Sequence, residues 1–151
     1  MEHLDSEMSG IIRYVKEIIG DKVQYLYKKI PENFKRPCIY FPVPEFRTRL
    51  SSTGYCNVSY MLLIKVFAPS TEEAYIYASK IALALAKDRY LIPVKYESDT
   101  KDNKNFFVQE PAISKTDSGV YTVEINWDSI KAYNKADVLK MQKHFENINH
   151  K

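Results

Sequence analysis

Residues 56–67, CNVSYMLLIKVF, form the longest alternating run in the chain. Every second position in this run is apolar: Cys56, Val58, Tyr60, Leu62, Ile64 and Val66. The positions between them are mixed and include Asn57, Ser59, Met61 and Lys65. Because successive side chains of a strand point to opposite faces, the pattern predicts a long strand whose fuller face meets helices.

The residues just before this strand predict a projecting β-hairpin. Residues 38–41, CIYF, are rich in strand formers, but Pro42 and Pro44 cannot donate ladder hydrogen bonds and so favour an edge or bulged strand. The chain continues through Phe46 and Leu50 to the turn at residues 51–54, SSTG, which leads into the long strand. We therefore expect an arm formed by the two strands on either side of this turn.

The N-terminal part predicts a helix followed by a strand. Its apolar residues recur at the three-and-four spacing of a helix from Met8 on, and Gly20 supplies a stop: Ile11, Ile12, Val15, Ile18 and Ile19. Residues 22–30 then alternate, with Val23, Tyr25 and Tyr27 on one side, until Pro31 breaks the pattern.

The second half of the chain predicts two more helices and two more strands. Ser70 and Glu73 have the spacing of a capping box, and the helix after them extends to about Asp88 with Ala74, Ala78, Ile81 and Leu85 on one stripe. Residues 97–105 predict an exposed loop. A strand begins at residues 106–108, residues 117–119 reverse the chain, and residues 120–128 form the last strand, with Tyr121, Val123, Ile125 and Trp127 inward. Residues 135–148 predict a terminal helix with Val138, Met141, Phe145 and Ile148 on one face.

Composition predicts one compact α+β domain. A length of 151 residues supports one sizeable core, and the longest apolar run is too short to cross a bilayer. The start, MEHLD, lacks the features of a secretory signal, so we expect the protein to remain where it is made. The net charge of +3 is too small for a nucleic-acid footprint, which predicts no specific nucleic-acid partner. Since no apolar run is long enough to cross a bilayer, we expect no membrane partner either.

No pattern in the sequence predicts catalysis, a metal site or a cofactor. Two of the three histidines lie close to a terminus, and the four glycines are too scattered for a phosphate-binding loop. Cys38 and Cys56 lie in apolar runs and are interpreted as free thiols, because a disulfide needs an oxidising compartment and a metal site needs more ligands. The sequence therefore favours a role in protein surfaces over one in chemistry.

Two features favour a docking surface. The first is the aromatic content of 12 tyrosines and 7 phenylalanines, since tyrosine is enriched at interfaces. Some of these tyrosines can face a partner, although core positions are the commoner use: Tyr14, Tyr40, Tyr55, Tyr75 and Tyr133. The second is a basic grouping, for which a solvated face is the simpler interpretation: Lys28, Lys29, Lys35, Arg36, Arg47 and Arg49.

The order of the elements resembles the tail terminator (tail completion) proteins of long-tailed bacteriophages and phage-like particles of Gram-positive bacteria. The resemblance covers residues 11–133. It implies a tail-terminator-like domain at residues 1–134, with a C-terminal helical extension of the same domain at residues 135–151. Four stretches carry it: RPCIYF at 36–41, YMLLIKVF at 60–67, the helix at 71–86, and DSGVYTV at 117–123 followed by Asn126-Trp127.

The resemblance implies a non-enzymatic virion protein in the neck region of the tail. Such proteins form a ring, generally sixfold, on the head-proximal end of the tail tube, end its polymerisation and present a surface for head joining. The implied partners are other copies of the chain, the tail tube protein, a head–tail connector or stopper protein and, in a contractile tail, the sheath. The implied fold is a mixed, mainly antiparallel sheet packed by two helices, with a projecting β-hairpin and an additional C-terminal helix.

Residues on or beside the arm are the candidate contacts to neighbouring subunits or to the tube: Phe46, Arg47, Arg49 and Tyr55. Two other functions remain open at this point. One is another connector or tail-tube component of the same virion, and the other is a nucleic-acid-binding module, in which exposed tyrosines beside lysines stack bases.

Overall fold

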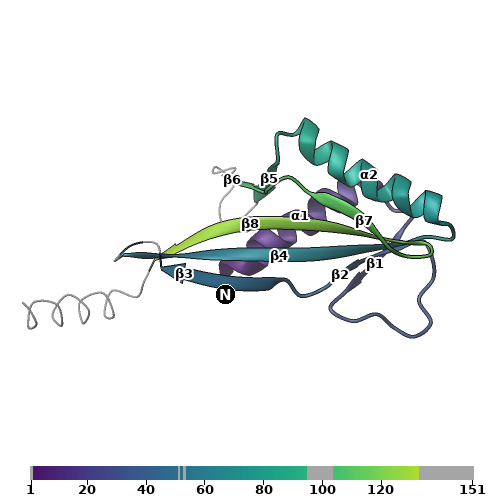
Figure 1. Ribbon diagram of the computed structural model, residues 1–151, viewed down its shortest axis with the longest axis horizontal. Coiled ribbons are helices and arrows are strands. Elements are labelled where there is room, and N and C mark those ends of the chain that lie inside the picture. The colour runs from purple at the N-terminus through teal and green to yellow at the C-terminus, as the bar shows by residue number, and fades with distance from the viewer. Residues whose placement is uncertain (1, 51, 53, 95–103, 133–151) are drawn as a thin grey trace, which may run out of the picture. The chain divides into compact units, whose positions relative to one another are not determined.

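The computed structural model describes residues 2–50, 52, 54–94 and 104–132. It contains two helices, α1 (Glu2–Ile19) and α2 (Thr71–Lys87). The strands are β1 (Gln24–Tyr27), β2 (Cys38–Phe41), β3 (Glu45–Leu50), β4 (Tyr55–Phe67), β5 (Leu91–Val94), β6 (Lys104–Phe107), β7 (Ala112–Asp117) and β8 (Val120–Ala132). Figure 1 shows these elements along the chain.

The main sheet has six strands in the order β1-β2-β4-β8-β7, with β3 paired to β4 beside this path. β1 runs parallel to β2, whereas β2 is antiparallel to β4 and β7 is antiparallel to β8. β5 and β6 form a separate antiparallel pair. The predicted α+β class with a mixed, mainly antiparallel sheet and two packed helices is therefore confirmed.

The chain divides into two compact units. The first contains the residues up to Glu45 together with Met61–Trp127, and the second contains Phe46–Tyr60 and the chain from Asp128 on. Both long strands contribute to both units, since β4 passes from the second into the first at Met61 and β8 leaves the first after Trp127.

Hydrophobic burial stabilises the first unit around its two helices. α1 contacts both β5 and α2 (Figure 1). Fully buried side chains come from α1, the even-numbered face of β4, α2, β5 and the odd-numbered face of β8: Ile11, Val15, Leu62, Ile64, Ala74, Ala78, Ile81, Leu85, Ile92, Val123, Ile125 and Trp127. The predicted core stripe of α2 is confirmed, and the predicted inner face of β4 is buried from Val58 to Val66, whereas Cys56 and Tyr121 are only half-buried.

Several boundaries differ from the prediction. α1 begins at Glu2, earlier than the apolar pattern indicates, and β1 is shorter than predicted because Lys28 has a φ of 63° that ends the extended chain. The strand predicted to run from Phe106 to the reversal at residues 117–119 is two strands, β6 and β7, separated by a segment that contains Pro111. β6 pairs with β5, a strand that sequence patterning missed because Pro93 lies inside it.

The end of the predicted loop at residues 97–105 is a strand in the structure, because Lys104 and Asn105 belong to β6. The rest of that loop and the predicted terminal helix at residues 135–148 lie outside the described residues.

Candidate interaction surface

An antiparallel arm carries the four residues that the sequence singled out. We define the arm as β3 together with residues 55–60 of β4, all but Glu45 of which belong to the second unit. All six residues of β3 are exposed, and β4 is the only strand with which it pairs in the described sheet. At the turn, the Ser52 amide donates to the Tyr55 carbonyl at 3.1 Å. β3 therefore presents an edge with unpaired backbone groups, which is the usual template for strand addition.

The four predicted residues are all exposed, but the structure divides them between two faces of the arm. Phe46 is 55% exposed, and its ring lies 6.1 Å from that of the buried Tyr60, so the two residues share a face. Along β3, Arg47 and Arg49 stand at odd-numbered positions, whereas Phe46 stands at an even-numbered one, so the arginines point to the face opposite Phe46. Along β4, Tyr55 likewise points to the face opposite Tyr60. These three residues therefore lie on the other face, which we call the basic face.

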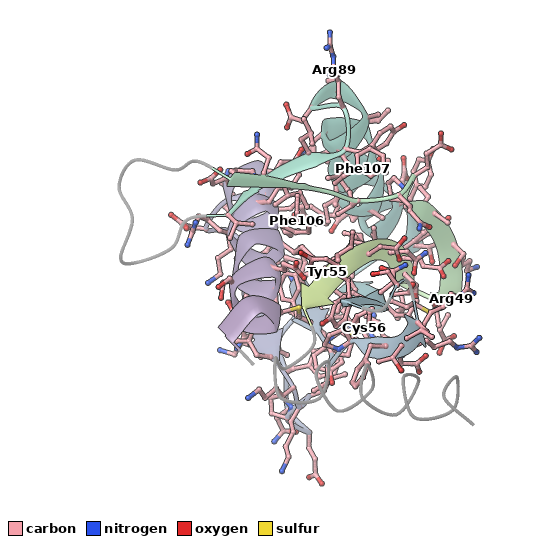
Figure 2. The ribbon with its side chains drawn as sticks, turned by 90° about the vertical axis from the view of Figure 1, so that its left-hand side faces the viewer. Arg49, Tyr55, Cys56, Arg89, Phe106 and Phe107 are labelled. Atoms are coloured by element: carbon pink, nitrogen blue, oxygen red, sulfur yellow. The ribbon has the colours of Figure 1, made fainter. Side chains whose placement is uncertain are left out.

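Figure 2 shows Arg49, Tyr55 and Cys56 as sticks. Tyr55 is 51% exposed and begins β4 after the turn. Cys56, the next residue, belongs to the same face as Phe46 and is half-buried. Arg47 and Arg49 project from the edge strand, where long side chains can reach a partner without displacing a neighbour. The basic face thus combines two guanidinium groups, which form bidentate hydrogen bonds with carboxylates, and one aromatic ring.

Two exposed apolar side chains of the second unit were not predicted as contact residues. Leu50 and Ile130 are each 69% exposed. Leu50 has the same parity as Phe46 and could have been found from the alternation of β3. Ile130 could not, because the sequence pattern indicates that the last strand ends at Asp128, whereas β8 extends to Ala132.

The first unit has a separate apolar surface at the β5–β6 pair. Leu91 and Phe107 are register partners and are 40% and 59% exposed, and the ring of Tyr90 lies 6.4 Å from that of Phe107. Figure 2 shows Phe106 and Phe107, which alternate along β6, and Arg89 at the turn after α2. Sequence reasoning missed this surface because it missed β5.

The remaining tyrosine candidates have different environments. Tyr14 is buried, and its hydroxyl donates to Asp88 at 2.5 Å. Burial, followed by the hydrogen bond and the charge of Asp88, raises its pKa well above the ordinary tyrosine value. The Tyr40 hydroxyl donates to the Lys28 carbonyl at 2.8 Å, whereas Tyr75 is 49% exposed beside Tyr121. Tyr133 lies outside the described residues.

The basic grouping that the sequence singled out is divided between the two units. Arg36 lies over the rings of Phe34 and Phe67, and its guanidinium donates to the Ala68 carbonyl at 3.1 Å. This arginine therefore has a packing role in the first unit, whereas Arg47 and Arg49 belong to the second.

The described residues contain no candidate metal site and one buried thiol. No group of three or more His, Cys, Asp or Glu side chains in it could hold a metal ion. Cys38 is fully buried, and burial raises the pKa of its thiol, which makes it a poor nucleophile. Neither described helix is long and apolar enough to cross a membrane.

Two curated proteins of Bacillus subtilis are similar to this chain in sequence. No family model matches the chain. It is 25% identical to the uncharacterised protein YqbJ of Bacillus subtilis (strain 168) over 134 residues, which are 89% of this chain and 90% of YqbJ. It is 24% identical to the phage-like element PBSX protein XkdJ of the same strain over 110 residues, 73% of this chain and 75% of XkdJ.

The fold also occurs in a virus-like particle. A chain in the solved structure of the virion of a native gene transfer agent particle superposes with a TM-score of 0.51 and 8% sequence identity, covering 86% of this chain and 97% of that chain. The protein is thus similar in sequence to a protein of a phage-like element and similar in fold to a chain of a virion particle.

Proposed function

We propose that this chain is a structural, non-enzymatic virion protein of a phage or phage-like particle, and that it forms a ring on the head-proximal end of the tail tube. The ring ends tube polymerisation and provides the surface on which the head is joined. Its partners are other copies of the chain, the tail tube protein, a head–tail connector or stopper protein and, where the tail is contractile, the sheath. It acts in the neck of the tail after synthesis in the host cytoplasm.

The observation that carries this proposal is the arm. An exposed six-residue edge strand presents unpaired backbone groups to which another chain can add, and exposed aromatic residues lie beside it. A ring needs a heterologous interface, in which one patch of each subunit meets a different patch of the next. An arm that adds to a neighbour's sheet or packs on a tube subunit supplies one side of that interface. The similarities to XkdJ and to the gene transfer agent chain support the virion setting.

The arm's two faces divide the candidate contacts. The basic face, with Arg47, Arg49 and Tyr55, is the side that we assign to neighbouring subunits or to the tube. Guanidinium groups recognise carboxylates bidentately, so the partner surface is expected to be acidic. Phe46 lies on the other face and is the fourth proposed contact to a neighbouring subunit or to the tube.

The test reverses the charge of the basic face. Arg47→Glu combined with Arg49→Glu is expected to leave a folded subunit, because both side chains are exposed on an edge strand. The variant should fail to cap tubes, so that electron microscopy shows overlong or headless tails. Lys22→Glu combined with Lys35→Glu makes the same change in net charge at exposed positions off the arm and should give tails of normal length.

The outcomes separate the alternatives. Tails of normal length carrying the arm variant would refute the role of the basic face. A wild-type protein that microscopy locates at another position, such as along the tube or in the head opening, would assign the chain to another connector or tail-tube component. A salt-dependent shift of short single strands at physiological ionic strength would instead favour nucleic-acid binding.

A further inference from the structure

The solvent side of α2 carries an apolar pair between two opposite charges. Ile76 is 43% exposed and Leu83 is 60% exposed. They lie seven residues apart, which is close to two full turns, so both belong to one side of the helix. Glu72 precedes this pair by one turn and Lys87 follows it by one turn, and both are exposed. We call these four residues the outer face of α2.

The outer face points away from the core of the first unit. At 3.6 residues per turn, its four residues lie within about 30° of the direction opposite the buried stripe of the helix. That stripe consists of Ala74, Ala78, Ile81 and Leu85. Figure 1 shows α2 beside β7, with no labelled element on its other side. No described element therefore covers the outer face.

The middle of the outer face is open to a second helix. The Ser79 hydroxyl donates to the Ile76 carbonyl at 2.9 Å, so this small polar group already has a partner. The Lys80 ammonium lies 6.0 Å from the centre of the Tyr77 ring, on the flank of the helix. A second helix can therefore cover the apolar pair without burying an unpaired hydroxyl or ammonium.

The outer face is complementary to a second copy of itself. When two α2 helices pack antiparallel about their common midpoint, each Ile76 lies opposite Leu83 of the other copy. The same register sets each Glu72 opposite Lys87 of the other copy, because these two residues are also equally far from the midpoint. Parallel packing would instead bring like charges together at both ends, so charge selects the antiparallel arrangement. Such a contact, in which the same patch serves both copies, is an isologous two-fold interface.

We propose that free copies of this protein form a homodimer through the outer faces of two antiparallel α2 helices. This contact differs from the head-to-tail contact of a ring, in which two different patches meet, so it does not rest on the proposed function. A pair of single helices buries less than the roughly 1,200 Å² of a standard stable interface. The dimer is therefore expected to be weak, with a dissociation constant on the order of tens of micromolar.

Sedimentation equilibrium of the full-length chain, from about 10 µM to about 1 mM, measures this dissociation constant. Leu83→Asp should raise it at least about tenfold, because each copy then places a charge in the apolar centre of the contact. Val43→Asp is the matched control, since Val43 is 65% exposed in the same unit but lies outside α2, and it should have no effect. A wild-type chain that stays monomeric over the whole range, or equal dissociation constants for the two variants, would overturn the dimer.

A mixing experiment tests the register of the two helices. In Glu72→Lys alone and in Lys87→Glu alone, like charges meet at both ends of the homodimer, and the dissociation constant should rise about fivefold or more at low ionic strength. A mixture of the two variants restores opposite charges at both ends of the heterodimer and should return to within about twofold of the wild type. Each variant also weakens its own helix dipole, but this cost persists in the mixture. Recovery therefore reports only a contact between copies.

The control for net charge uses Glu32→Lys and Lys22→Glu, which make the same two charge changes at exposed positions outside α2. These variants should associate as the wild type does, both alone and mixed. The antiparallel contact would be excluded by a mixture of the α2 variants that associates no more tightly than either variant alone. It would equally be excluded if the control variants showed the same loss and recovery.

Discussion

Gly119→Ala is expected to be severely destabilising, because this glycine sits where three segments converge. It lies in the turn between β7 and β8 with a φ of 72°. Its amide donates to the Thr71 hydroxyl at 2.9 Å, and its carbonyl accepts from the Ala68 amide at 2.9 Å. A Cβ at this position would lie 2.8 Å from the Ala68 carbonyl oxygen and 2.7 Å from a guanidinium nitrogen of Arg36.

The magnitude follows from two separate costs. A positive φ costs a residue with a Cβ about 1–2 kcal/mol. The clash with backbone adds about 1–3 kcal/mol, as overpacking does elsewhere. The expected loss of roughly 2–5 kcal/mol is large against the total stability of a domain, which is about 5–15 kcal/mol.

Gly20 provides the matched control. Its φ is 93°, but a Cβ there would meet nothing within 4 Å, so Gly20→Ala has the backbone cost without the clash. We expect it to lose about 1–2 kcal/mol. Gly54 also faces open space and has no left-handed φ, so Gly54→Ala should be neutral or should stabilise the protein by about 0.4–1 kcal/mol.

Urea unfolding measures all three variants through the fluorescence of Trp127, the single tryptophan, which is 1% exposed in the folded protein. The order of stability should be Gly54→Ala, then Gly20→Ala, then Gly119→Ala. If Gly119→Ala lost no more free energy than Gly20→Ala, the close approach of Ala68 to the turn would be refuted.

Three further changes test contacts of the first unit. The pKa of Tyr14 is raised above the ordinary value of 10.0, so the stability that its protonated hydroxyl contributes is present below pH 10 and is lost as the pH rises further. In Tyr14→Phe, the free energy of unfolding should therefore fall less steeply above pH 10. At neutral pH this variant should lose about 1–2 kcal/mol, because the hydrogen bond to Asp88 is absent. Ser70→Ala removes the side-chain acceptor that caps α2 and should lower the free energy of unfolding by about 0.5–2 kcal/mol in urea titrations. Glu7→Ala removes the carboxylate that accepts from the Trp127 indole at 2.8 Å and should lower the urea midpoint, at a loss of about 1 kcal/mol, with an unchanged slope.

Each of these changes has a distinct refuting result. Identical high-pH profiles for wild type and Tyr14→Phe would exclude this hydroxyl as a source of the alkaline loss. Unchanged stability in Ser70→Ala would mean that the cap is replaced by solvent. A changed slope in Glu7→Ala would indicate an altered unfolded or native state instead of one lost hydrogen bond.

Periodicity in the sequence was sufficient for the elements that bury one face. The even positions of β4 from Val58 to Val66 and the stripe of α2 recur at the periods of a strand and a helix, and both faces are buried as predicted. Ser70 was recognised as the cap because its spacing to Glu73 is local, and its hydroxyl accepts from the Glu73 amide at 3.2 Å. Local patterns of this kind need no knowledge of the partners.

Strand pairing could not be obtained in the same way. β5 is short and contains Pro93, so only its pairing with β6 across the intervening chain identifies it as a strand. The segment from Phe106 to the reversal at residues 117–119 forms two strands because β6 pairs with β5 whereas β7 pairs with β8, and this division between two sheets depends on the tertiary structure. The surface formed by Leu91 and Phe107 was missed for the same reason.

The sequence alone determined the α+β class, the two amphipathic helices, the long strand and the arm, because each depends on the spacing of apolar residues within one segment. Only the tertiary structure decided which strands pair and which side chains remain exposed. It also separated Phe46 from Arg47, Arg49 and Tyr55, since residues close in sequence lie on opposite faces of a strand and their neighbours come from elsewhere in the chain. The physical reason is that burial is a property of the whole packing, whereas periodicity is a property of one segment.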